Sequence, residues 1–165
     1  MASESLVIDR IVDDLYAGAL EPTAWERGLK SIARLIGGQG PFLLSFNPTT
    51  AAVLRDQLYD YDPAVFRDFR ELWSAKDIRL PAALSVPVDT AMTERTLLPH
   101  GEWERCEAFN EFFKINDAPW LITAWLHKSP EKVALFSVQA TRSRGPFGDR
   151  DIARVARLVP HVRRA

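Results

Sequence analysis

The chain has 165 residues, enough for one domain with a buried core. Hydrophobic residues make up 47% and charged residues 26%, which is typical of a soluble globular protein. The formal net charge of −1 excludes a strongly basic surface of the kind that binds nucleic acid or anionic lipid. We expect neither a membrane span nor a signal peptide, and the single cysteine, Cys106, favours a cytoplasmic location without internal disulfides.

Helical spacing of apolar residues dominates the first part of the chain. It predicts one helix over 4–19 and a second from Pro22 to Ile36, which Gly37 and Gly38 end. Two short apolar segments, 41–46 and 51–58, flank a turn over 47–50 and predict a β-hairpin.

The middle of the chain is less regular. Asp62 and Pro63 predict the cap and first turn of a third helix. Residues 78–99 carry three prolines and no clear period, which predicts a long connection of the kind that covers a binding cavity. A helix is predicted over 101–114, followed by a second hairpin of strands over 119–127 and 133–140. The first of these strands is apolar on both faces and should lie inside the sheet.

The last predicted element is a helix that begins at Asp149, which we expect to cap it, after a turn over 145–148. Pro160 should kink or end this helix, because proline lacks the amide hydrogen and clashes with the preceding turn. We interpret its apolar stripe and basic exit as a dimer seam or an output contact, formed by Ile152, Val155, Ala156, Val159, Arg163 and Arg164. Arg150, Arg154 and Arg157 are expected to form a solvated face.

Hairpins with helices around them predict an α+β domain on one antiparallel sheet. Four segments carry a family resemblance: Ile11 to Trp25, Cys106 to Phe112, Gly145 to Asp149 and Leu158 to Ala165. With them the chain resembles the PAS/GAF-like sensor domains that precede the helix-turn-helix module of LuxR-type transcription regulators. The resemblance implies a sheet of about four to five strands flanked by helices, a sensor over 1–148 and an output helix over 149–165. DNA would then be bound only through a C-terminal module beyond this sequence.

A second likeness is to the autoinducer-binding domains of quorum-sensing regulators. Tyr61 to Phe66, then Phe69, Trp73 and Asp77, are similar in order to the Tyr-Pro, Trp, Tyr and Asp-Pro positions of those domains. There the aspartate accepts a hydrogen bond from the amide of the ligand. Two departures from the acyl-homoserine lactone pattern are present, since Phe66 stands in place of tryptophan and no proline follows Asp77.

Aromatic residues of the middle segment are the candidate ligand-binding set. Rings offer a flat ligand area and stacking, and one carboxylate, Asp60 or Asp77, would fix its orientation. We expect this set to comprise Tyr59, Tyr61, Phe66, Phe69, Trp73, Asp77 and Trp103. The alternative for each ring is that it fills the core.

No catalytic or metal motif is apparent. Cys106 and His100 have no spacing that brings thiol and imidazole together, so an inert, packed cysteine is expected rather than an enzyme. The three histidines are isolated, and neither metal nor cofactor is expected. The sequence therefore predicts a domain that senses a small apolar or aromatic metabolite and forms a homodimer. The alternative is a ligand-free module for dimerisation or for binding a protein partner.

Overall fold

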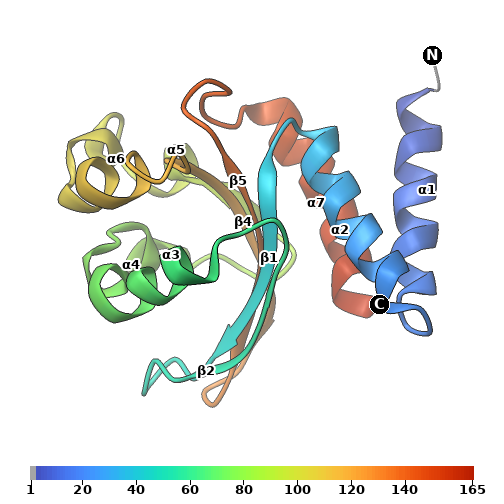
Figure 1. The fold of residues 1–165 in the computed structure, drawn as a ribbon, viewed down its shortest axis with the longest axis horizontal. Coiled ribbons are helices and arrows are strands. Elements are labelled where there is room, and N and C mark those ends of the chain that lie inside the picture. The colour runs from blue at the N-terminus through green and yellow to red at the C-terminus, as the bar shows by residue number, and fades with distance from the viewer. Residues whose placement is uncertain (1–2) are drawn as a thin grey trace.

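In the computed structural model, which describes residues 3–165, five antiparallel strands form one sheet between two layers of helices (Figure 1). The order across the sheet is β2-β1-β5-β4-β3. The strands are β1 (Gln39–Phe46), β2 (Val53–Leu58), β3 (Ala91–Thr93), β4 (Trp120–Lys128) and β5 (Val133–Ala140). The predicted α+β class, the two hairpins and the interior position of β4 are confirmed.

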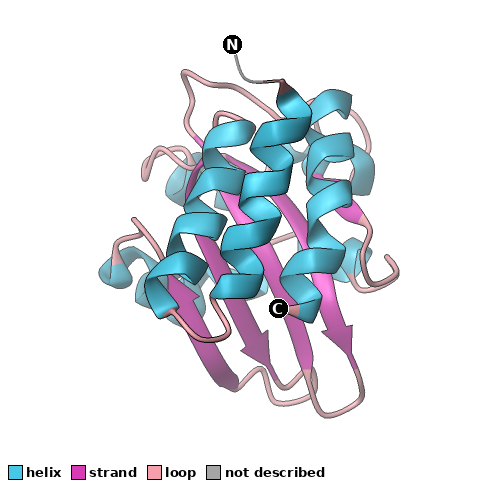
Figure 2. Cartoon of the chain, turned by 90° about the vertical axis from the view of Figure 1, so that its right-hand side faces the viewer, coloured by secondary structure: helices cyan, strands magenta, loops and turns pink. Residues whose placement is uncertain are grey.

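Three long helices cover one face of the sheet (Figure 2). They are α1 (Glu4–Ala17), α2 (Pro22–Leu35) and α7 (Asp149–Arg164). The Ser3 hydroxyl caps α1 by accepting a hydrogen bond from the Leu6 amide, and Pro22 lies in the first turn of α2. Gly37 follows α2 with a φ of 65°, the left-handed conformation that commonly ends a helix.

The opposite face carries a layer of short helical segments. Asp62 begins it as predicted, because its side chain accepts a hydrogen bond from the Ala64 amide at 2.8 Å. The segments are α3 (Pro63–Asp68), a π-helical turn (Phe69–Trp73), a 3₁₀ turn (Ser74–Lys76), α4 (Arg79–Ala83), α5 (Glu94–Leu97), α6 (Glu102–Arg105) and a second π-helical turn (Phe109–Phe113).

Two predictions for this layer were wrong. Residues 78–99 line a cavity, as expected, but instead of an irregular connection they form α4, the edge strand β3 and α5. The helix expected over 101–114 is broken at Cys106, whose extended backbone separates α6 from the second π-helical turn. Elements of three to five residues are too short to show a hydrophobic period, which explains why the sequence pattern missed them.

At Pro160 the sequence predicted either a kink or the end of the helix, and the second alternative is wrong. The helix does not end at Pro160 but continues through it to Arg164. Asp149 is its first residue rather than its cap, and the carboxylate of Asp151 accepts a hydrogen bond from the Gly148 amide at 2.9 Å instead. Asp151 is the third residue of α7, so its side chain occupies the capping-box position and accepts the hydrogen bond of the amide that precedes the helix.

The apolar stripe of α7 is part of the core. Val155 and Val159 are 1% and 0% exposed, and Ile152 and Ala156 pack beside them against α1, α2 and the sheet. Val155 and Val159 therefore have no free surface for the dimer seam expected from the sequence. Arg150 and Arg157 are exposed, as expected of a solvated face, whereas Arg154 is half-buried. Arg150 and Arg154 both contact Glu4 of α1, at 2.9 and 2.7 Å.

Alternation along the strands separates two cores. In β4, Ile122 and Ala124 face the three long helices, whereas Leu121, Thr123 and Trp125 face the short ones. β5 alternates in the same way. This is why β4 is apolar on both faces, and it leaves the second face free to line a cavity.

Candidate functional site: a cavity beneath the short helices

A cavity of about 410 Å³ lies between the sheet and the layer of short helices. Its floor consists of side chains from three neighbouring strands, Phe42 and Leu44 of β1, Leu135 and Ser137 of β5, and Thr123 and Trp125 of β4. Its roof comes from α3, the first π-helical turn, α4 and α5. A volume of this size suits a small organic molecule.

Four of the seven predicted ligand-binding residues line this cavity: Tyr61, Phe66, Phe69 and Asp77. The Tyr61 ring meets Phe66 edge to face at 6.1 Å and Phe42 of β1 at 5.7 Å. These contacts join the short helices to the floor of the cavity. Aromatic edges and faces at such distances form a firm wall for a flat or chain-like ligand.

The other three predicted residues lie outside the cavity. Trp103 is 1% exposed within a cluster of phenylalanines, and its indole donates a hydrogen bond to the Pro119 carbonyl at 2.8 Å. Trp73 stacks on Phe112 with ring centroids 5.6 Å apart. Tyr59 lines a different pocket on the other face of the sheet. For Trp103 and Trp73, packing rather than ligand contact explains the aromatic side chain.

A buried charge cluster lines one part of the cavity, formed by Asp77, Arg79 and Glu94. The Arg79 guanidinium donates to both oxygens of Asp77, at 2.9 and 2.7 Å, and to Glu94 Oε1 at 3.0 Å. The Arg79 amide also donates to Asp77 at 3.0 Å. The guanidinium lies over the rings of Trp103, at 3.9 Å, and Phe113, at 4.5 Å. Three of the five N–H groups of the guanidinium therefore bind carboxylate oxygens, and two aromatic rings pack against it.

Burial sets the protonation behaviour of this cluster. It raises the pKa of Glu94 to about 7, against the opposing effects of Arg79 and of hydrogen bonds to the carboxylate. Burial alone would lower the pKa of Arg79, but the charges of Asp77 and Glu94 outweigh it and raise that pKa. Arg79 is therefore a permanent cation, and Glu94 is the group of the cluster that titrates near neutral pH.

Two polar atoms of the cavity wall have no hydrogen-bond partner among residues 3–165: Glu94 Oε2 and Thr93 Oγ1. Both side chains are buried, with Thr93 2% and Glu94 3% exposed. Glu94 Oε1, in contrast, accepts from Arg79 and from the Leu121 amide at 2.6 Å. Buried polar atoms are nearly always paired, so these two atoms are exceptions within the described part of the fold.

Arg79, Thr93 and Glu94 were not among the site residues predicted from the sequence. All three fall in the segment read as an irregular connection, where no period separates buried from exposed positions. The signal that was present is compositional, since a charged residue inside an apolar stretch must be paired if it is buried. An ion pair between Asp77 and Arg79, which are two residues apart, could have been predicted in this way. The ion pair of Arg79 with Glu94 could not, because 15 residues separate them.

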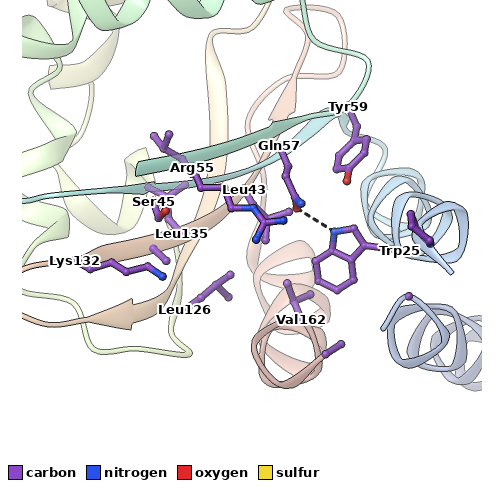
Figure 3. Close-up of a pocket in the computed structure, with 15 residues that line it drawn as sticks. Trp25, Leu43, Ser45, Arg55, Gln57, Tyr59, Leu126, Lys132, Leu135 and Val162 are labelled. Carbon is purple, nitrogen blue, oxygen red and sulfur yellow. Dashed lines mark hydrogen bonds between the residues drawn. The ribbon is translucent and has the colours of Figure 1, made fainter. Parts of the chain in front are cut away.

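A second pocket of about 450 Å³ lies on the opposite face of the sheet, beside the turn between α1 and α2 and the end of α7 (Figure 3). Trp25 reaches across it to donate a hydrogen bond to Gln57 at 3.2 Å. Tyr59, Arg55 and Lys132 also line it. It is the more open of the two pockets, because solvent rather than a helical layer covers much of it.

The described residues offer no assembled catalytic or metal centre. Within residues 3–165 no group of three or more His, Cys, Asp or Glu side chains is placed to hold a metal ion. Cys106 is half-buried, and its sulfur accepts a hydrogen bond from the Phe109 amide at 3.4 Å. In the same range, none of the helices has the length and apolar character to cross a membrane.

Two solved structures share this fold. The chain is similar to the ligand-binding domain of VqsR from Pseudomonas aeruginosa, with a TM-score of 0.67, 16% identity, and coverage of 92% of this chain and 89% of that chain. It is also similar to CepR2 from Burkholderia cenocepacia, an N-acylhomoserine lactone dependent LuxR-family transcription factor. That match has a TM-score of 0.65, 10% identity, and coverage of 96% of this chain and 92% of that chain.

No protein-family model and no curated protein sequence matches the chain. The similarity to both solved structures extends over most of the chain. The fold of this chain is therefore that of the ligand-binding domains of LuxR-family regulators.

Proposed function

We propose that the chain is the sensory domain of a LuxR-type transcription regulator and that it binds a small molecule with an apolar or aromatic body. The observation that carries this proposal is the cavity of about 410 Å³, lined by Phe42, Tyr61, Phe66 and Phe69, in a fold shared with ligand-binding domains. Its aromatic walls favour rings and alkyl chains, while the Asp77–Arg79–Glu94 cluster provides a polar end.

The response to a ligand would pass through the edge of the sheet to α7. β3 and β4 line the cavity on one face and pack against α7 on the other. The end of α7 is also tied to the loop before β3, because Arg163 forms an ion pair with Asp89 at 2.8 Å. A ligand that fits one arrangement of β3 better than another would shift the population of α7 positions accordingly.

The regulator would act in the cytoplasm as a homodimer and contact DNA through a separate helix-turn-helix module. We propose α1, rather than the stripe of α7, as the dimer surface. Leu6, Tyr16 and Leu20, in and just after α1, are 62%, 44% and 95% exposed, whereas the α7 stripe is buried. Sedimentation analysis of Leu6→Asp and Leu20→Asp variants tests this, and we expect both to weaken the dimer. A dimer that neither substitution weakens would mean that the interface lies elsewhere.

The alternative function, a ligand-free dimerisation or partner-binding module, predicts a closed core. The cavity beneath the short helices favours the sensory function over it.

Two matched substitutions test the sensory function. Ser137 faces the cavity and Ser45 faces the second pocket, so Ser137→Phe and Ser45→Phe add the same ring on opposite faces of the sheet. A bound ligand at 100 times its Kd stabilises the fold by about 2.7 kcal/mol, which is a rise in Tm of roughly 5–10 °C for this size. Ligand screening by thermal shift should give hits that Ser137→Phe abolishes and Ser45→Phe retains.

Hits that Ser45→Phe abolishes and Ser137→Phe retains would place the ligand in the second pocket. Native mass spectrometry of the purified protein gives an independent check, since a co-purified molecule should be lost from Ser137→Phe.

A further inference from the structure

We propose that the second pocket, of about 450 Å³, is a binding site in its own right and takes a small carboxylate with an aromatic or alkyl body. It lies on the opposite face of the sheet from the cavity beneath the short helices, so the proposal does not depend on what that cavity binds. The shape of the pocket, its aromatic wall and its unpaired positive charge support this assignment.

Small side chains create the second pocket. The strands extend past the ends of the three long helices, so this part of the sheet lies outside the helical layer (Figure 2). Across the sheet, Arg55 of β2 pairs with Ser45 of β1, which in turn pairs with Ala134 of β5. Because two small residues lie side by side on neighbouring strands, they leave a hollow among the longer side chains that line the pocket.

The walls of the second pocket suit an apolar or aromatic body. Trp25 of α2 and Tyr59, just after β2, form an aromatic wall at one end (Figure 3). The Trp25 indole is held in place by the hydrogen bond that it donates to Gln57 at 3.2 Å. Leu126 of β4 and Val162 of α7 add aliphatic surface. A fixed ring beside aliphatic side chains favours a flat ring or a short alkyl chain.

The charge of the second pocket favours an anion. Arg55 and Lys132 line it and are exposed, and neither side chain forms an ion pair within residues 3–165. No Asp or Glu of the described chain lines the pocket. The cavity beneath the short helices, in contrast, is lined by Glu71, Asp77 and Glu94 as well as by two arginines. The second pocket is therefore the more positive of the two.

An acidic neighbour of the second pocket is already paired. Burial raises the pKa of Tyr59, Glu26 raises it further and Arg55 lowers it, so both charges act on the phenol. The Glu26 carboxylate, however, binds Lys30 at 2.7 Å, which leaves Arg55 without a counter-charge. Because its pKa is raised, Tyr59 stays a neutral phenol and can donate a hydrogen bond to a carboxylate beside it.

Three probes with one ring system test the charge preference: 1-naphthaleneacetate, 2-(1-naphthyl)ethanol and 2-(1-naphthyl)ethylamine. Binding is followed at about pH 7.5 by the indole N–H resonances of Trp25, in the second pocket, and Trp125, in the cavity. Trp25→Phe and Trp125→Phe assign these resonances. The chain carries a short neutral extension after Ala165, because that residue lines the pocket and a terminal carboxylate there would repel the anionic probe.

We expect the carboxylate to shift the Trp25 resonance and to leave that of Trp125 unchanged. It should bind about three- to tenfold more tightly than the alcohol or the amine, because two exposed cations each contribute modestly.

Variants then assign the preference to the two cations. Arg55→Gln and Lys132→Gln should each weaken the carboxylate by about two- to threefold, and the double variant should bind the carboxylate and the alcohol equally. Lys114→Gln removes an exposed cation that lines neither pocket, so it is the matched control and should change no affinity. Raising the salt concentration from about 0.05 M to about 0.5 M should weaken carboxylate binding in the wild type but not in the double variant. Ser45→Phe fills the hollow and should abolish binding of all three probes at Trp25.

The outcomes separate this inference from the proposed function. Equal affinities of the three probes, no carboxylate binding at about 5 mM, or a shift of Trp125 in place of Trp25 overturns the anion site. Each of these results leaves the Ser137→Phe test of the cavity unaffected. A Trp25 resonance that moves with protein concentration alone would show that a second copy of the chain covers the pocket, which also overturns the site. A cooperative thermal transition for each variant verifies that a lost signal is not a lost fold.

Discussion

Arg79 holds the polar end of the cavity together, because it is the cation between two buried carboxylates. Replacing it with methionine keeps the length and apolar contacts of the side chain but leaves Asp77 and Glu94 facing each other without a counter-charge. Arg79→Met should lower the free energy of unfolding by about 3–5 kcal/mol, as expected for breaking a buried ion pair.

Lys76→Met, which breaks the exposed pair with Glu107, is the control and should cost no more than about 1 kcal/mol. Urea unfolding measures both. Equal effects of the two substitutions would mean that the buried cluster contributes nothing beyond a surface pair.

Glu94 makes stability depend on pH near neutrality. Its pKa is about 7 in the fold, against an ordinary value of 4.5, so between these values the folded chain holds a proton that the unfolded chain has released. The free energy of unfolding should therefore fall as the pH rises from about 5 to about 8, by a few kcal/mol at most.

Urea titrations at a series of pH values measure this slope. Glu94→Gln, which cannot titrate, should flatten it, whereas Glu107→Gln should leave it as in the wild type. A slope that survives in Glu94→Gln would assign the titration to another group.

At the level of single residues, the sequence predicted only part of the site. Phe66 and Phe69 were found because they lie on the apolar face that follows the Asp62 cap, and Tyr61 and Asp77 because their order matches the family resemblance. Trp103 was misplaced because a ring on a helix face looks the same whether it seals a core or lines a cavity. The role of Glu94 depends on pairing across the fold, which local pattern does not encode.

At the scale of elements, α7 contains an internal proline that the fold tolerates. Pro160 has no amide hydrogen to donate to the carbonyl of Ala156, yet the helix continues to Arg164. Buried neighbours on both sides of it, Val159 and Val162, fix the last turns against the core. Tertiary packing therefore overrides the local preference of proline to end a helix.

Pro160→Ala should restore the missing hydrogen bond and raise the free energy of unfolding by about 1–2 kcal/mol. Thermal unfolding measures the change. The matched substitution Pro22→Ala, in the first turn of α2 where proline is favourable, should not stabilise the fold. A loss of stability in Pro160→Ala would show that the proline ring itself contributes essential packing.

Among the elements, length decided what could be predicted. The helices α1, α2 and α7 have 14 to 16 residues, and β1, β4 and β5 have 8 or 9, so each shows its period in full. The segments around the cavity have three to six residues and appear in the sequence as irregular chain.

At the scale of the whole molecule, the two helical layers should differ in stability. The long helices pack on a continuous core, whereas the short segments over residues 63–113 rest partly on a cavity. Amide hydrogens of the short segments should therefore exchange faster than those of β4, β5 and α2, because regions with fewer buried contacts open at lower free energy.

Hydrogen exchange followed by mass spectrometry tests this order, and a ligand found by the thermal-shift screen should slow exchange mainly within residues 63–113. Equal protection of both helical layers in the free protein would mean that the cavity does not lower the local stability of the short segments above it.

The alternation of β4 and β5 has a consequence for how such a domain diversifies. Positions that line the cavity, such as Thr123 and Ser137, alternate with positions that hold the long helices, such as Ile122 and Val138. A substitution at the first kind reshapes the ligand space without touching the second kind. Ligand preference can therefore drift, or be redesigned, on every second residue of a strand while the intervening residues keep the scaffold and its connection to α7 intact.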